Sequence, residues 1–170
     1  MFNFFKKNTT TAFEKHFIDI TSLPCISECQ CYKPLTAAYL FVISDFVLMG
    51  TGKLHARNEN AQEIFSILEN KLLSSTELKL FDRYVDLFGG IMRGAISARG
   101  DWCFSDGPSS NPIMNLYMCF GDLLKYPEYI NDYANAPIVI LPISKLTDFS
   151  IKFRAVPSIT QSSIDNIERR

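Results

Sequence analysis

The chain has 170 residues, a formal net charge of −1, 47% hydrophobic residues and 13% aromatic residues. This length suits one domain with a sizeable core, and the composition excludes a disordered chain. The balanced charge lacks the basic excess typical of nucleic-acid-binding proteins, so we expect no nucleic-acid partner. We expect residues 1–170 to form a single globular domain with loose tails at residues 1–12 and 157–170.

The five cysteines are an odd number, and no secretory signal is visible in the first 15 residues, MFNFFKKNTTTAFEK. We therefore expect reduced thiols and a cytoplasmic location. The densest cysteine cluster is Cys25, Cys29 and Cys31, whose thiolates could hold zinc. Their spacing differs from the two-residue spacing of zinc ribbons, so we interpret them as structural cysteines and expect no metal or cofactor.

The first half of the chain predicts one strand and one buried helix. Residues 16–21, HFIDIT, are β-branched and aromatic and favour a strand. Residues 35–49 form the most apolar stretch, and Pro34 suits the first turn of a helix there; a pair of strands is the alternative. This stretch is too short to span a bilayer and is interrupted by Asp45, so a membrane-spanning segment is disfavoured.

The middle of the chain predicts an antiparallel helix hairpin from residues 60–73 and 75–99. Asn60 with Glu63 and Ser74 with Glu77 have the spacing of capping boxes, which indicates two helix starts. In the second helix the apolar residues recur at steps of three and four, and we expect this helix to organise the fold.

The last third predicts a helix over residues 112–125, which begins at the Asn111–Pro112 pair. Residues 138–141 form a β-rich run between prolines, and residues 148–155 alternate apolar and polar side chains as a half-buried strand does. The predicted class is α+β and predominantly α-helical: a helical bundle with a small sheet from 138–141 and 148–155, to which 16–21 could add a strand.

Two polar features are candidate binding sites. Asp45 lies in an apolar helix and requires a partner, which would be a core arginine or a ligand in a pocket. A second cluster follows the long predicted helix, where two guanidiniums, an indole and two carboxylates could bind a peptide or an anion: Arg93, Arg99, Asp101, Trp102 and Asp106.

Known catalytic motifs are not present at the required spacing. Residues 50–53, GTGK, resemble the end of a phosphate-binding loop, but Val47 stands where its first glycine is needed and Leu54 where Ser or Thr is needed. His55 has no orienting partner that the sequence reveals, so we expect an exposed histidine.

These observations favour a non-enzymatic protein-interaction domain of the inhibitor, immunity or adaptor type, whose partner is another protein. One alternative is a small-ligand-binding protein or hydrolase with a cleft near Asp45, His55 or the segment from Arg93 to Asp106. Another is a peripheral membrane protein anchored by the aromatic and basic residues between Phe2 and Lys7, which we consider the weaker interpretation.

Overall fold

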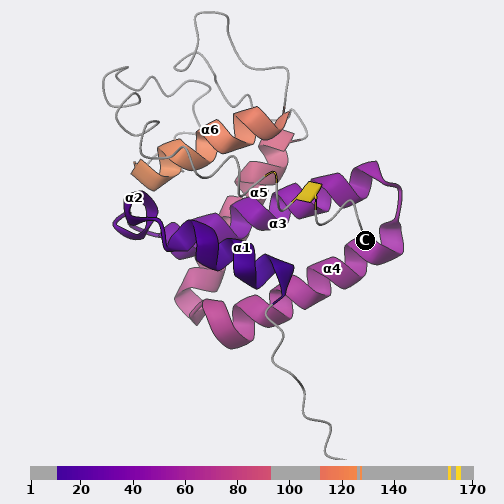
Figure 1. Cartoon of the computed structure of the whole chain (residues 1–170), viewed down its shortest axis with the longest axis horizontal. Coiled ribbons are helices and arrows are strands. Elements are labelled where there is room, and N and C mark those ends of the chain that lie inside the picture. Colours follow the sequence, from indigo (N-terminus) through magenta and orange to yellow (C-terminus); the bar gives the residue numbers. More distant parts are fainter. Residues whose placement is uncertain (1–10, 93–111, 126, 128–160, 162–163, 166–170) are drawn as a thin grey trace, which may run out of the picture.

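The structure is a computed structural model that describes residues 11–92, 112–125, 127, 161 and 164–165, and its secondary structure there is helical (Figure 1). The main elements in chain order are α1 (Ala12–Thr21), α2 (Pro24–Ser27), α3 (Tyr32–Gly50), α4 (Leu54–Ile67), the π-helix η1 (Leu68–Leu72), α5 (Ser75–Met92) and α6 (Pro112–Lys125).

Helix α3 is the centre of the fold and packs against α1, α4, α5 and α6. Tyr39 of α3 is fully buried and stacks on Phe120 of α6, with ring centroids 4.3 Å apart. Within the described residues, α3 is the one helix whose length and apolarity alone would allow it to cross a membrane. Its most apolar window is 61% buried inside the fold, which accounts for its composition because core helices are apolar on most sides.

One hydrophobic cluster joins all the helices. Its largest fully buried side chains come from α1, α2, α3, η1, α5 and α6, and Ile164 near the end of the chain also belongs to it. These side chains are Ile20, Ile26, Leu35, Tyr39, Leu40, Ile43, Leu68, Phe81, Tyr84, Phe88, Leu116 and Phe120. Burial of this apolar surface is the main term that stabilises the bundle.

Helix α5 begins where its capping box predicts. The backbone N–H of Ser74 donates to Glu77 Oε2 at 2.8 Å, and the N–H of Glu77 donates to Ser74 Oγ at 3.3 Å. These two bonds satisfy backbone donors that a helix start leaves without partners. The prediction of a helix start at Ser74 is therefore confirmed.

The predicted small β-sheet is wrong. Residues 16–21 lie in α1, where His16, Phe17 and Ile20 are buried on one face at the three- and four-residue steps of a helix. A capping box of Thr11 and Glu14 starts this helix and outweighs the β preference of the aromatic and branched residues. The other predicted strands, 138–141 and 148–155, lie outside the described residues. The residues that the structure describes contain no strand. A helical bundle therefore replaces the predicted α+β class.

The helix boundaries differ from prediction at one important place. The helices predicted at 35–49 and 112–125 are confirmed as α3 and α6, but α4 starts at Leu54, six residues before the expected start, and Asn60 lies inside it. The predicted antiparallel hairpin paired α4 with α5. In the structure α4 runs antiparallel to α3 instead, and α5 also packs mainly against α3. The predicted second helix is described as far as Met92, and its expected continuation to residue 99 lies outside the described part.

Candidate functional site

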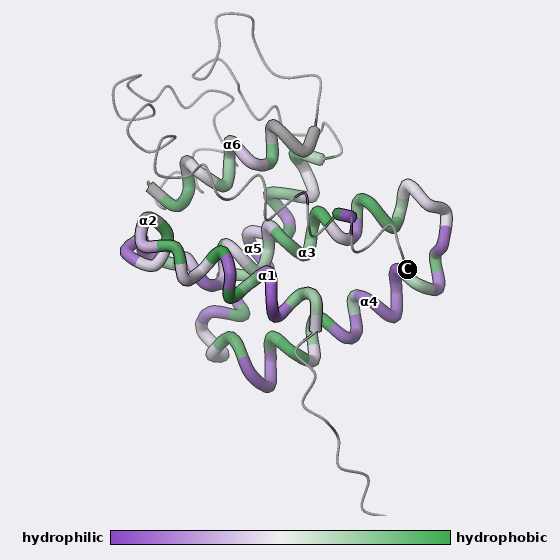
Figure 2. The backbone as a smooth tube through the Cα atoms, in the orientation of Figure 1, coloured by the Kyte–Doolittle hydropathy of each residue, from purple (hydrophilic) through white to green (hydrophobic). Residues whose placement is uncertain are grey.

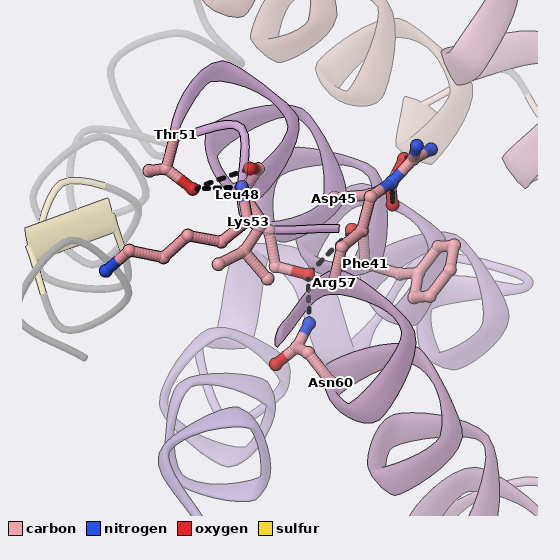
Figure 3. A network of polar contacts seen from close by, with 8 residues as sticks. Phe41, Asp45, Leu48, Thr51, Lys53, Arg57 and Asn60 are labelled. Carbon is pink, nitrogen blue, oxygen red and sulfur yellow. Dashed lines mark hydrogen bonds and ion pairs between the residues drawn. The ribbon is translucent and has the colours of Figure 1, made fainter. Parts of the chain in front are cut away.

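An ordered turn joins α3 to α4. Gly52 has a φ of 70°, a left-handed conformation that glycine adopts without strain. The Thr51 hydroxyl donates to the carbonyl of Leu48 at 2.7 Å, and the N–H of Lys53 donates to the Thr51 hydroxyl at 3.4 Å (Figure 3). We call residues 49–54 the α3–α4 corner, and its conformation is fixed by these local contacts.

Asp45 of α3 forms a bidentate ion pair with Arg57 of α4. Arg57 Nη2 donates to Asp45 Oδ2 at 2.7 Å, and Arg57 Nε donates to Oδ1. The hydrogen bonds and charge of the carboxylate raise the pKa of Arg57, so the guanidinium stays charged at neutral pH. The structure thus supplies an arginine partner for the carboxylate that interrupts the apolar helix.

Beside this pair, a chain of hydrogen bonds links the same two helices. Asn60 Nδ2 donates to Ser44 Oγ at 3.1 Å, and Ser44 Oγ donates to the carbonyl of Phe41 at 2.8 Å (Figure 3). Ser44 is only 4% exposed, so its hydroxyl needs these partners. Arg57 and Asn60 both face α3 because they are three residues apart on one helix.

The sequence contains a signal for these contacts. Antiparallel helices joined by a short turn bring together residues at similar distances from the turn. Asp45 and Arg57 lie six residues on either side of Thr51 and form the ion pair. Counting outward from the glycine-containing turn would have paired Asp45 with Arg57.

The corner also exposes apolar side chains. Met49 is 49% exposed and Leu54 is 65% exposed, on either side of the turn. They are two of the four large apolar side chains that are exposed among the described residues; the others are Ile18 and Phe65. Lys53 lies between them in sequence, and Figure 3 shows its side chain extending away from the Asp45–Arg57 pair.

His55 follows the corner and points to solvent. Its Nε2 lies 3.3 Å from Glu59 Oε1, one turn along the same helix, and the two side chains are 89% and 66% exposed. The structure therefore does not bring His55 together with Asp45, which is engaged with Arg57. Among the described residues, His55 and Asp45 therefore do not form a pair for general-base catalysis.

The cluster of Cys25, Cys29 and Cys31 is described only in part, because the side chain of Cys25 lies outside the described residues. Cys29 and Cys31 are half-buried thiols, and among the described residues no group of three or more His, Cys, Asp or Glu residues could hold a metal. Cys31 precedes α3 with a φ of 56° and interacts with Tyr84 of α5. Burial and the hydrogen bond with Cys31 raise the pKa of Tyr84, so the phenol remains neutral and this contact is structural.

The second predicted binding cluster falls outside the described residues. Its members are Arg93, Arg99, Asp101, Trp102 and Asp106, and the side chain of Cys25 also lies outside the description. Of the predicted binding residues, the structure therefore places Asp45 alone, and the corner beside it is the candidate site.

Comparison with known proteins adds no relative: no protein-family model, curated protein or solved structure matches the chain.

Proposed function

We propose that this chain is a non-enzymatic protein-interaction domain and that the α3–α4 corner is one of its contact surfaces. The observation that carries the proposal is the exposure of Met49 and Leu54 at a turn held by internal hydrogen bonds. Single exposed apolar residues are common on any protein, but two at one ordered turn provide a preformed apolar contact. A rigid contact loses little conformational entropy when a partner binds it.

The chemistry of the corner indicates what its partner presents. Leu54 fully buried by a partner would contribute about 1.5–3 kcal/mol, so the partner needs an apolar pocket. Lys53 carries the charge next to this side chain, which favours an acidic rim around the pocket. A protein inhibitor, immunity protein or adaptor acts through contacts of this kind, and the cluster from Arg93 to Asp106 stays a predicted second contact region.

A hydrolase or small-ligand site near Asp45 and His55 has less support. The Asp45 carboxylate is occupied by Arg57, and the His55 side chain lies at the surface with Glu59. An enzyme would need these groups to converge on one bound substrate. The peripheral membrane hypothesis depends on residues between Phe2 and Lys7, which lie outside the described part, and it stays a prediction.

Site-specific photocrosslinking tests the proposal. A benzoylphenylalanine at position 54 should crosslink one stoichiometric protein in a lysate of the source organism, whereas the same probe at position 69, an exposed site on η1, should not. The substitution Leu54→Lys should weaken binding of the recovered partner at least about tenfold while leaving the fold intact.

Other outcomes would replace the proposal. Crosslinking of the chain to itself would make the corner a self-association surface. Flotation with liposomes that Leu54→Lys abolishes would reassign the corner to membrane binding. Equal crosslinking from positions 54 and 69 would indicate nonspecific contact and would count against the corner.

A further inference from the structure

Helix α4 is anchored at one end. Of its 14 residues, the buried ones are Ile64 and Ile67, both near its end. None of residues 54–63 is buried, and Figure 2 shows this part of α4 as largely hydrophilic beside the hydrophobic α3. Apolar burial therefore holds the end of α4, while its beginning depends on other contacts.

Two of those other contacts are the polar ones at the candidate site. Arg57 pairs with Asp45, and Asn60 donates to Ser44. Asp45 and Arg57 are 29% and 35% exposed, so water competes with their ion pair. Such partly exposed pairs contribute far less than a buried apolar side chain.

A structural irregularity lies on each side of α4. Before it, Gly52 takes a left-handed conformation in the turn. After it, the chain continues as the π-helix η1, Leu68–Leu72. Glycine turns permit large changes in backbone angles, and a π-helix interrupts the regular hydrogen-bond pattern. The glycine turn borders residues 54–63 directly, whereas η1 lies beyond the buried Ile64 and Ile67, so any opening of residues 54–63 starts from the turn.

Movement of this segment would uncover part of α3. Ser44 is 4% exposed, and its hydroxyl accepts a hydrogen bond from Asn60 of this segment. Exposure of Ser44 would lengthen the part of α3 that a partner can reach beside Met49 and Leu54, which are already accessible.

We propose that residues 54–63 form a lid on α3 that the Asp45–Arg57 ion pair and the Asn60–Ser44 hydrogen bond hold closed. The opening of this lid regulates how much of α3 a partner reaches. The existence of the lid does not depend on any partner; its regulatory role rests on the proposed function.

Native-state hydrogen exchange of the full chain tests the lid at urea concentrations below global unfolding. The amides of residues 58–66 should exchange through an opening that depends little on urea, because a short helical segment exposes little surface. The amides of α5 should instead exchange with the steep urea dependence of global unfolding. The substitution Asp45→Asn should accelerate exchange in residues 58–66 about fivefold, whereas Asp86→Asn on the exposed face of α5 should leave it unchanged.

Two results would overturn the lid. One is a common urea dependence for the amides of α4 and α5, which would mean that α4 opens only when the whole chain unfolds. The other is an unchanged exchange rate of residues 58–66 in Asp45→Asn. Raising the sodium chloride concentration on the unmodified chain should also accelerate these amides, so the test does not depend on one variant. Failure to find a partner for the corner would leave these exchange results unaffected, so the two proposals can fail separately.

Discussion

Glu14 and Lys71 are 57 positions apart in the sequence, and Lys71 Nζ donates to Glu14 Oε1 at 3.0 Å. The other carboxylate oxygen, Oε2, accepts a hydrogen bond from the N–H of Thr11. The Glu14 side chain therefore both caps α1 and links α1 to η1. Glu14 is 7% exposed although it is charged. A buried carboxylate is tolerated where each oxygen has a donor.

The position of Glu14 predicts a loss of stability in acid. Hydrogen bonds from the Thr11 backbone and from Lys71 lower the pKa of Glu14 below its usual 4.5. Since the folded chain binds this proton less readily than the unfolded chain does, the stabilisation is complete above pH 4.5 and is lost as the pH falls through the lowered value. Glu14→Gln should cost about 1 kcal/mol at pH 7, as the loss of a helix cap does, and this difference should shrink below pH 4.5 in urea titrations at several pH values.

His16 predicts a second acid-sensitive step at higher pH. Burial lowers the pKa of His16 below its usual 6.5, and the charge of Lys15 adds to this while that of Asp19 opposes it. Because the unfolded chain takes up this proton first, stability should begin to fall as the pH drops below 6.5. His16→Gln should remove this part of the pH dependence and leave the part below pH 4.5. An unchanged slope between these two regions would contradict this assignment.

The stacked pair of Tyr39 and Phe120 predicts the most sensitive position of the core. Both rings are fully buried and their centroids are 4.3 Å apart. Phe120→Ala should cost about 3–5 kcal/mol in the free energy of unfolding because it removes the stacking and leaves a cavity. Phe65→Ala removes the same atoms from a side chain that is 37% exposed, and we expect a clearly smaller loss. Equal losses in urea unfolding would mean that α6 is not packed on α3 as described.

The helices were predictable because their signals are local. The capping box at Ser74 and the apolar length of α3 are each contained within one element, and both predictions are confirmed. Pro112 at the start of α6 acts in the same way. Local signals of this kind are independent of what the rest of the chain does.

Prediction failed where two local signals compete. Residues 16–21 have β-favouring side chains but also belong to the helical pattern that begins at Thr11. The helix forms because it buries His16, Phe17 and Ile20 together on one face. The pair Asn60 and Glu63 has capping spacing, yet Asn60 lies within α4 and donates to Ser44 instead. The partner of Asp45 depends on the geometry of the α3–α4 turn, which neither helix reveals separately.

The turn between α3 and α4 predicts opposite effects for two glycines. Gly52 has a φ of 70°, and Gly50 ends α3; a Cβ added to either would meet no atom within 4 Å. Because space is not limiting, only backbone conformation should matter. Gly52→Ala should cost about 1 kcal/mol, since a side chain strains the left-handed conformation. Gly50→Ala should be neutral or stabilising by up to about 1 kcal/mol, since alanine favours the helix. Thermal unfolding of both variants measures this difference, and equal effects would contradict the assigned turn.

A double-mutant cycle on Asp45 and Arg57 measures the contact at the candidate site. Removal of either charge leaves the other partly buried without its partner, so Asp45→Asn and Arg57→Gln should each destabilise the chain. The double variant should lose less than the sum of the two, with a coupling of about 1 kcal/mol, because the pair is bidentate but only half-buried. His55 and Glu59 form the matched control, since that pair is largely exposed and should give a coupling near zero at neutral pH. Additive effects for Asp45 and Arg57 would mean that the ion pair does not hold α4 on α3 in solution.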